Sequence, residues 1–176
     1  MGGGLLGQVT GVSSFALLRP PAHQVSPRAR MLWRIEAVLG ALPIVAAQVL
    51  WWVSDSTGPR PIQVWLAIAT VVIEAAYLVV MPLWRYRVHR WEVTDEAVFT
   101  QTGWFTQERR IAPITRIQTV DLTRGPVSGL LGLATVRVTT ASSAGPLRIH
   151  GLAHEQALEI VESLTALTIA DPGDAT

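Results

Sequence analysis

The sequence predicts an α+β protein in which a transmembrane hairpin of two helices precedes a small β-sandwich capped by a C-terminal amphipathic helix. Two long apolar runs fill the first half of the chain, strand-like alternation begins after Trp84, and helical spacing returns at residue 154. The 176 residues are 49% hydrophobic and only 15% charged. Such a composition fits a membrane anchor joined to one small domain.

Residues 1–30 lead into the hairpin. The segment is rich in glycine near its start, and glycine-rich chain ends lack the side chains that would tie them to a core. We expect a mobile lead-in.

The two apolar runs lie within residues 31–84. They read "IEAVLGALPIVAAQVLWWV" (35–53) and "IQVWLAIATVVIEAAYLVVMPLW" (62–84), and each is close to the roughly 20 residues that cross a hydrocarbon core. The segment between them, "SDSTGPRP" (54–61), has the glycine and prolines of a tight turn. A pair of buried helices in a soluble protein is the alternative, but too little chain remains to cover them.

Tryptophan marks the ends of both runs. Its indole ring has an apolar body and one N–H group that favours water, so it is enriched at membrane interfaces. We expect five tryptophans to lie there: Trp33, Trp51, Trp52, Trp65 and Trp84.

The arginines indicate the orientation of the hairpin. They precede the first run and follow the second, whereas the connecting loop holds only Arg60. Because basic residues resist translocation, this pattern places both chain ends and the β-sandwich in the cytoplasm. Anionic head groups attract each basic residue near the surface by about 1 kcal/mol. We expect three arginines at the membrane interface: Arg85, Arg87 and Arg90.

Glu74 lies in the middle of the second run, where an ionised carboxylate costs roughly 2.5–3.5 kcal/mol. It therefore needs a partner. Three interpretations remain open: a proton or ion relay, a polar contact that joins helices of an oligomer, or a protonated carboxyl group hydrogen-bonded to Gln48 or to nearby backbone.

The alternation after the second run predicts six strands. Within the fifth, Ala134, Val136 and Val138 share one face, which we expect to be the core face. In the fourth, the apolar positions fall out of phase, which predicts a β-bulge near Thr119. The expected strands are residues 85–94, 98–103, 104–113, 114–123, 133–141 and 145–152.

The cytoplasmic module, residues 85–170, ends in a predicted amphipathic helix over 154–168. Residues 171–176 read as a loose tail. The apolar stripe of the helix is predicted to contain Leu158, Val161, Leu164 and Thr165, with Ala157 and Thr168 nearby.

The order of these elements resembles a known family. Two spans precede "R-Y-x-V…W-x-V-T-D", then "RRI-x-P", then the most specific stretch, "RIQTVDLTRGPVSGLLGLATVRVTT" (116–140). Over roughly residues 15–168 the chain resembles bacterial pleckstrin-homology (PH) proteins of the YdbS-like membrane type. The resemblance implies two bent antiparallel sheets sealed by a helix, at the inner face of a bacterial plasma membrane. It also implies that "GPVSGLLGL" forms a short helical turn, with Leu130, Leu131 and Leu133 filling the core.

Few residues point to chemistry. The chain has no cysteine and no phosphate-binding or nucleophile motif, and its net charge of +1 gives no field to attract nucleic acid. His150 and His154 have helical spacing, but His150 belongs to a predicted strand and no further ligand completes a metal set. The first strand loop, "TDEA" (94–97), is acidic, which argues against phosphoinositide binding. We predict no catalytic residue, metal, cofactor or small-molecule substrate.

These patterns favour a non-enzymatic, membrane-anchored adaptor that binds another protein, either a second copy or a related PH-like membrane protein. The alternative is a module that senses anionic lipids through the arginines that follow the second run.

Overall fold

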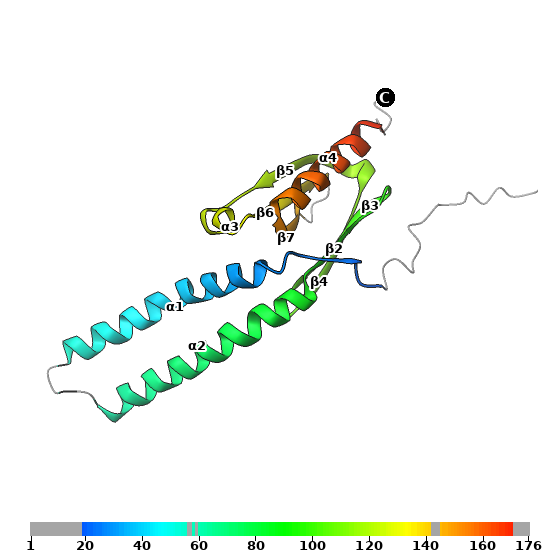
Figure 1. Ribbon diagram of the computed structural model, residues 1–176. Coiled ribbons are helices and arrows are strands. Elements are labelled where there is room, and N and C mark those ends of the chain that lie inside the picture. Colours follow the sequence, from blue (N-terminus) through cyan, green and yellow to red (C-terminus); the bar gives the residue numbers. More distant parts are fainter. Residues whose placement is uncertain (1–18, 56–57, 59, 142–144, 171–176) are drawn as a thin grey trace, which may run out of the picture.

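Two long antiparallel helices form a rod, and a β-sandwich lies at one end of it (Figure 1). The computed structural model describes residues 19–55, 58, 60–141 and 145–170. Most of the expected lead-in and the whole expected tail lie outside these residues. The predicted α+β class, with an apolar hairpin before a capped sandwich, is confirmed.

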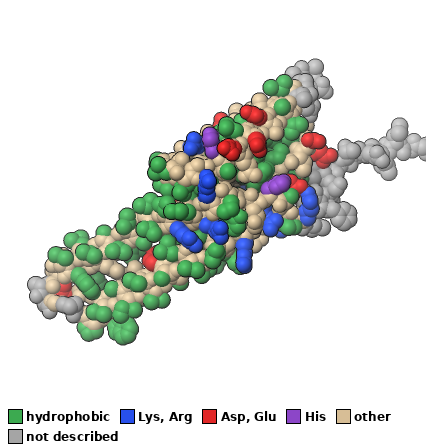
Figure 2. All heavy atoms as spheres, in the orientation of Figure 1, with side chains coloured by type: hydrophobic (Ala, Val, Ile, Leu, Met, Phe, Trp, Pro, Cys, Tyr) green, Lys and Arg blue, Asp and Glu red, His purple; other side chains and the backbone are tan. Residues whose placement is uncertain are grey.

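The hairpin consists of α1 (Ala29–Ser54) and α2 (Pro61–Val88). Both helices are long and apolar enough to cross a membrane, and almost none of their apolar surface is buried inside the protein. Hydrophobic side chains cover the rod in Figure 2. Pro61 supplies the first helical position of α2, where proline is favoured because no N–H partner is needed.

Both helices extend beyond the predicted spans into the module. The predicted strand over 85–94 is wrong in its first half, because α2 continues to Val88 and β2 begins only at Arg90. No glycine or proline follows Pro82 to end the helix, and Met81, Arg85 and Val88 recur at helical spacing on its less exposed side. The alternation at 86–88 is therefore incidental.

The module contains two antiparallel sheets. A 3₁₀ turn (Ile114–Arg116) leads from the first sheet to the second, and the short helix α3 (Pro126–Leu130) joins β5 to β6. The first sheet has the order β1 (His23–Gln24), β2 (Arg90–Val93), β3 (Ala97–Gly103), β4 (Gln107–Pro113), and the second has the order β5 (Ile117–Thr123), β6 (Leu133–Thr140), β7 (Leu147–Ala153).

Part of the lead-in belongs to the module. Within residues 19–28, which we expected to be mobile, β1 pairs with β2, and Val25 is buried in the core. Glu92 on β2 accepts a hydrogen bond from the Ala22 backbone N–H at 3.0 Å and pairs with Arg19. These contacts fix the point where the chain enters α1.

The second sheet agrees with most of the sequence expectations. The register of β5 against β6 shifts between Ile117 and Thr119, which confirms the predicted bulge. The helical turn over 126–130 is also confirmed. Leu133 lies in the core and Leu131 packs against the core, as predicted, but Leu130 is 90% exposed. Ala134, Val136 and Val138 of β6 are also buried in the core, as expected.

The C-terminal helix α4 (His154–Ala170) packs on the second sheet through a face that overlaps the predicted stripe at Ala157, Val161 and Leu164. Ala157, Ile160 and Leu164 are buried, whereas Leu158 is 43% exposed and Thr165 is exposed. The buried residues follow the i, i+3, i+7 spacing of one helix face. The predicted stripe included Leu158 and Thr165, which lie to one side of that face, and it missed Ile160.

Candidate functional site

The face of α2 that packs against α1 carries the polar side chains of the hairpin. Gln63, Thr70 and Glu74 are spaced seven and four residues apart, so they share one helix face. All three are less exposed than Val71 and Ile73, which are 68% and 66% exposed on the outer side of the helix. A polar seam therefore runs between two otherwise apolar helices.

Two members of this seam have partners. The Gln63 side chain donates a hydrogen bond to Asp55 Oδ2 at 3.1 Å, and the Gln48 amide of α1 donates to Thr70 Oγ1 at 2.6 Å. The Thr70 hydroxyl donates in turn to the Leu66 carbonyl at 2.9 Å. These bonds give Gln63 and Thr70 partners within the hairpin itself.

Glu74 differs from its neighbours. A hydrogen bond between Glu74 and Gln48, one of the three interpretations of the sequence, is absent, and the Gln48 amide bonds to Thr70 one turn away. Among the described residues, no group forms a hydrogen bond or ion pair with the Glu74 carboxyl group. The hairpin thus carries a carboxyl group in mid-span that it does not satisfy alone.

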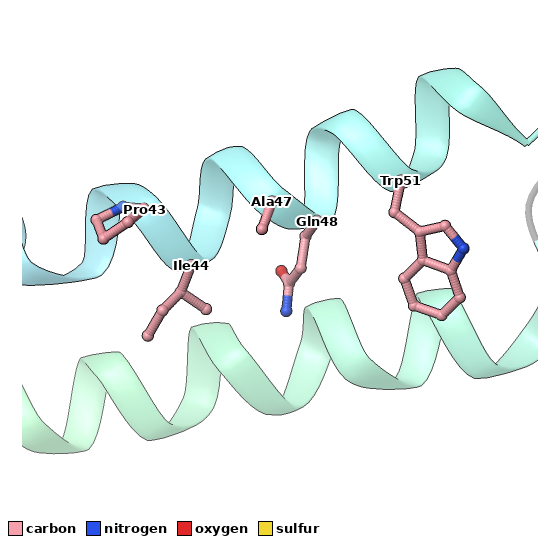
Figure 3. Close-up of a pocket in the computed structure, with 5 residues that line it drawn as sticks. All are labelled: Pro43, Ile44, Ala47, Gln48 and Trp51. Atoms are coloured by element: carbon pink, nitrogen blue, oxygen red, sulfur yellow. The ribbon is translucent and has the colours of Figure 1, made fainter.

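A shallow groove runs along α1 beside this seam (Figure 3). Its volume is about 460 Å³, and its lining is apolar except for the Gln48 amide. In Figure 3, the Ile44, Gln48 and Trp51 side chains project from α1 toward α2. The lining residues are Pro43, Ile44, Ala47, Gln48 and Trp51.

The five tryptophans predicted at the membrane interface fall into two groups. Trp51, Trp52, Trp65 and Trp84 are exposed near the ends of the helices, as residues at a membrane interface would be. Trp33 is only 1% exposed and lies in the core of the protein. The expectation that Trp33 meets the membrane interface is therefore wrong.

Trp33 is the centre of the junction between hairpin and module. Its ring packs against His89 at 5.0 Å between centroids, and the Arg85 guanidinium lies over it at 4.7 Å. Arg85 also pairs with Glu36 of α1, with 3.9 Å between Nη1 and Oε2. A cavity of about 350 Å³ adjoins this cluster, with His150 in its wall.

The three arginines predicted to face lipid head groups do not act alike. Arg85 turns into the junction, as described, and the Arg90 guanidinium donates to the Pro21 carbonyl at 3.3 Å. Arg87 is exposed. The structure therefore leaves Arg87 as the most accessible of the three.

The histidines of the junction are kept neutral by their surroundings. Burial, together with the nearby Arg85 charge, lowers the pKa of His89 to about 4. Burial lowers the pKa of His150 as well, with smaller contributions from Arg85 and Arg148. A neutral His89 can donate its Nδ1 proton to the Arg85 carbonyl, which lies 2.8 Å away.

We expect this burial to make the stability of the protein depend on pH. In the unfolded chain His89 takes up a proton near pH 6.5, whereas the folded protein keeps it neutral down to about pH 4. The unfolded state therefore binds more protons between these values, and the free energy of unfolding falls by about 2 kcal/mol from pH 6.5 to about pH 5. Well above pH 6.5 His89 is neutral in both states, and this contribution stays constant.

Urea titrations of the detergent-solubilised protein, followed by circular dichroism at several pH values, measure this dependence. The variant His89→Asn keeps an N–H group near the Arg85 carbonyl but removes the titration, so its slope should be smaller. An equal slope in both proteins would show that another group causes the effect.

Sequence reasoning missed the tip of the β3–β4 hairpin. The predicted strand over 104–113 begins too early, because β4 starts at Gln107 and residues 104–106 form the turn. The available signal was the pair of aromatic residues, Trp104 and Phe105, directly after Gly103, which has a φ of +120°. In the part of the chain that the structure describes, no three His, Asp or Glu side chains gather in a way that could hold a metal.

Comparison with known proteins shows to which family this chain belongs. The sequence profile described as bacterial PH domain matches residues 31–168. The chain belongs to the bacterial PH domain family. The match includes the apolar hairpin as well as the sandwich, so the family resemblance extends over both parts of this PH domain protein.

A curated relative supports the assignment. The UPF0699 transmembrane protein YdbS of Bacillus subtilis (strain 168) is 31% identical over 160 residues, which cover 84% of this chain and 92% of the relative. No solved structure gives a significant match. With a transmembrane relative and two apolar helices of its own, this bacterial PH domain protein is membrane-associated.

Proposed function

We propose that both helices cross a bacterial plasma membrane and that the sandwich and both chain ends lie in the cytoplasm. Arginine side chains gather where the rod meets the module, whereas the rod itself is hydrophobic (Figure 2). The loop at the far end of the rod carries only Arg60, which pairs with Asp55 at 3.3 Å. This distribution follows the preference of basic residues for the cytoplasmic side.

Within this topology, we propose that the protein is a non-enzymatic adaptor whose hairpin associates with a second copy of the chain. The observation that carries the proposal is the unsatisfied carboxyl group of Glu74. A charged group in mid-membrane costs roughly 2.5–3.5 kcal/mol when it has no partner. A second hairpin that supplies a donor removes part of that cost, and polar contacts of this kind join membrane helices.

The groove on α1 supports the same partner. It lies beside the polar seam, is lined by apolar side chains, and exposes the Gln48 amide. An amide has two N–H donors, and only one is needed for the bond to Thr70. In a pair of hairpins, Gln48 of one copy is therefore a suitable donor for Glu74 of the other.

The rival function, a sensor of anionic lipids, receives less support from the geometry. It requires Arg85, Arg87 and Arg90 to face the head groups together. Arg85 stacks on Trp33 and Arg90 bonds to Pro21, so the three charges do not form one open patch. In our proposal, membrane lipids surround the two helices, and we propose no site for a specific lipid.

The test replaces Glu74 by leucine in the full chain, reconstituted in nanodiscs or mild detergent. Interhelical polar contacts in membranes contribute about 0.6–2 kcal/mol, so the dissociation constant of the dimer should rise by about 3- to 30-fold. Glu74→Gln keeps the hydrogen-bonding groups and should retain most of the association. Analytical ultracentrifugation over a range of protein-to-detergent ratios measures the constant.

A matched control is Ile73→Leu, which changes an exposed apolar side chain next to Glu74. Its dissociation constant should equal that of the unmodified protein. A monomeric unmodified protein, or a Glu74→Leu variant that associates as well as the control, would exclude self-association through this group. Co-purification of a different PH-like protein in place of a second copy would identify the partner as a relative.

A further inference from the structure

The tip of the β3–β4 hairpin exposes two large aromatic side chains. Phe105 is 89% exposed and Trp104 is 36% exposed, and their rings meet edge to face at 4.8 Å. Such a pair at the end of a hairpin buries little apolar surface within the protein. It is available for contact with an apolar phase outside it.

The tip lies against α2. The Trp84 indole N–H donates to the Trp104 carbonyl at 2.8 Å, and the Trp104 ring meets the Tyr77 ring at 5.9 Å. Along α2, Tyr77 lies about 10 Å further from the module than Trp84, because an α-helix rises 1.5 Å per residue. The tip thus points from the module back along the rod, beside the part of α2 that we place in the membrane.

The shape of the turn is fixed by Gly103. Its φ of +120° is one that side chains with a Cβ rarely adopt, and a Cβ there would lie 1.9 Å from the Thr106 carbonyl oxygen. The polar residues begin immediately behind the tip, with Gln107 and Glu108 exposed on β4. The β3–β4 hairpin therefore has an apolar tip and polar residues directly behind it.

We propose that Trp104 and Phe105 insert into the cytoplasmic side of the bilayer and form a third membrane contact beside the two helices. Lipid is the occupant because the tip continues the exposed apolar surface of α2, where Leu83 and Trp84 are also uncovered. Tryptophan and phenylalanine are suited to this depth. The contact fixes the angle between the sandwich and the membrane, because the module is then attached at the tip as well as at the helix ends.

The inference rests on the proposed membrane crossing of α2, and the test separates the two. The chain has no cysteine, so single-cysteine variants of the full protein can each carry one nitroxide spin label. Phe105→Cys reports on the tip, Val72→Cys on the exposed outer side of α2, and Glu96→Cys on the exposed β2–β3 turn. In nanodiscs, collisions with oxygen report lipid and collisions with a water-soluble nickel chelate report water.

We expect the logarithm of the oxygen-to-nickel collision ratio to be positive at positions 72 and 105 and negative at position 96. A negative value at 105 with a positive value at 72 overturns the inference and leaves the membrane crossing intact. Negative values at both overturn both. Protection from both reagents at 105 that disappears when the lipid-to-protein ratio is raised shows that a second copy covers the tip, and this also overturns the lipid contact.

Discussion

Replacement of Trp33 by alanine should lower the free energy of unfolding of the module by about 3–5 kcal/mol, the range measured for large aromatic side chains in cores. The side chain is 1% exposed and fills the space between α1, the end of α2 and the second sheet. Its loss also removes the surface on which the Arg85 guanidinium lies and against which His89 packs. Urea titration in mild detergent, followed by circular dichroism, measures the change.

Trp51→Ala is the matched control, because Trp51 belongs to the same helix but is exposed. Its effect on the unfolding of the module should be small. Trp33→Phe should fall between the two, since it keeps a ring in the cavity. If Trp33→Ala destabilises the protein no more than Trp51→Ala, the hairpin and the module are not packed together as described.

Trp33 also shows why the site could not be predicted from the sequence. A tryptophan at the end of an apolar run has the same local pattern whether it meets lipid or a protein core. The deciding neighbours, Arg85 and His89, lie far along the chain and come close only when α1 and α2 pack side by side. The same holds for Gln48, whose bond to Thr70 depends on the register of the two helices.

Features set by local periodicity were predictable. The apolar runs predicted the helical hairpin. The change of phase at Thr119 predicted the bulge, because one extra residue in a strand reverses the faces on which the following side chains lie. Two of the errors arose where two periods coexist. Residues 86–88 alternate like a strand and also fit the helical face of α2. In α4, two adjacent stripes are both partly apolar. Packing against the sheet decides which of the two stripes is buried.

The second large effect is expected at Gly151, where the start of α1 is fixed to β7. The Ser26 N–H donates to the Gly151 carbonyl at 2.9 Å, and a Cβ at position 151 would lie 2.8 Å from the Ala29 Cβ. The glycine also has a φ of +74°. Gly151→Ala should therefore lower the free energy of unfolding by about 2–4 kcal/mol, from backbone strain of about 1–2 kcal/mol plus overpacking.

Two variants separate these causes in the same urea titrations. Gly40→Ala is the control, because a Cβ there meets nothing within 4 Å and alanine favours the helix by about 1 kcal/mol, so stability should rise slightly. Adding Ala29→Gly to Gly151→Ala removes the clash between the two Cβ atoms but leaves the strained φ. The double variant should therefore regain only the stability lost to overpacking. From this gain the cost of placing a glycine in α1 must be subtracted. A Gly151→Ala protein as stable as the Gly40→Ala control would mean that α1 does not begin against β7, and the rigid attachment of the sandwich to the hairpin would then lose its structural basis.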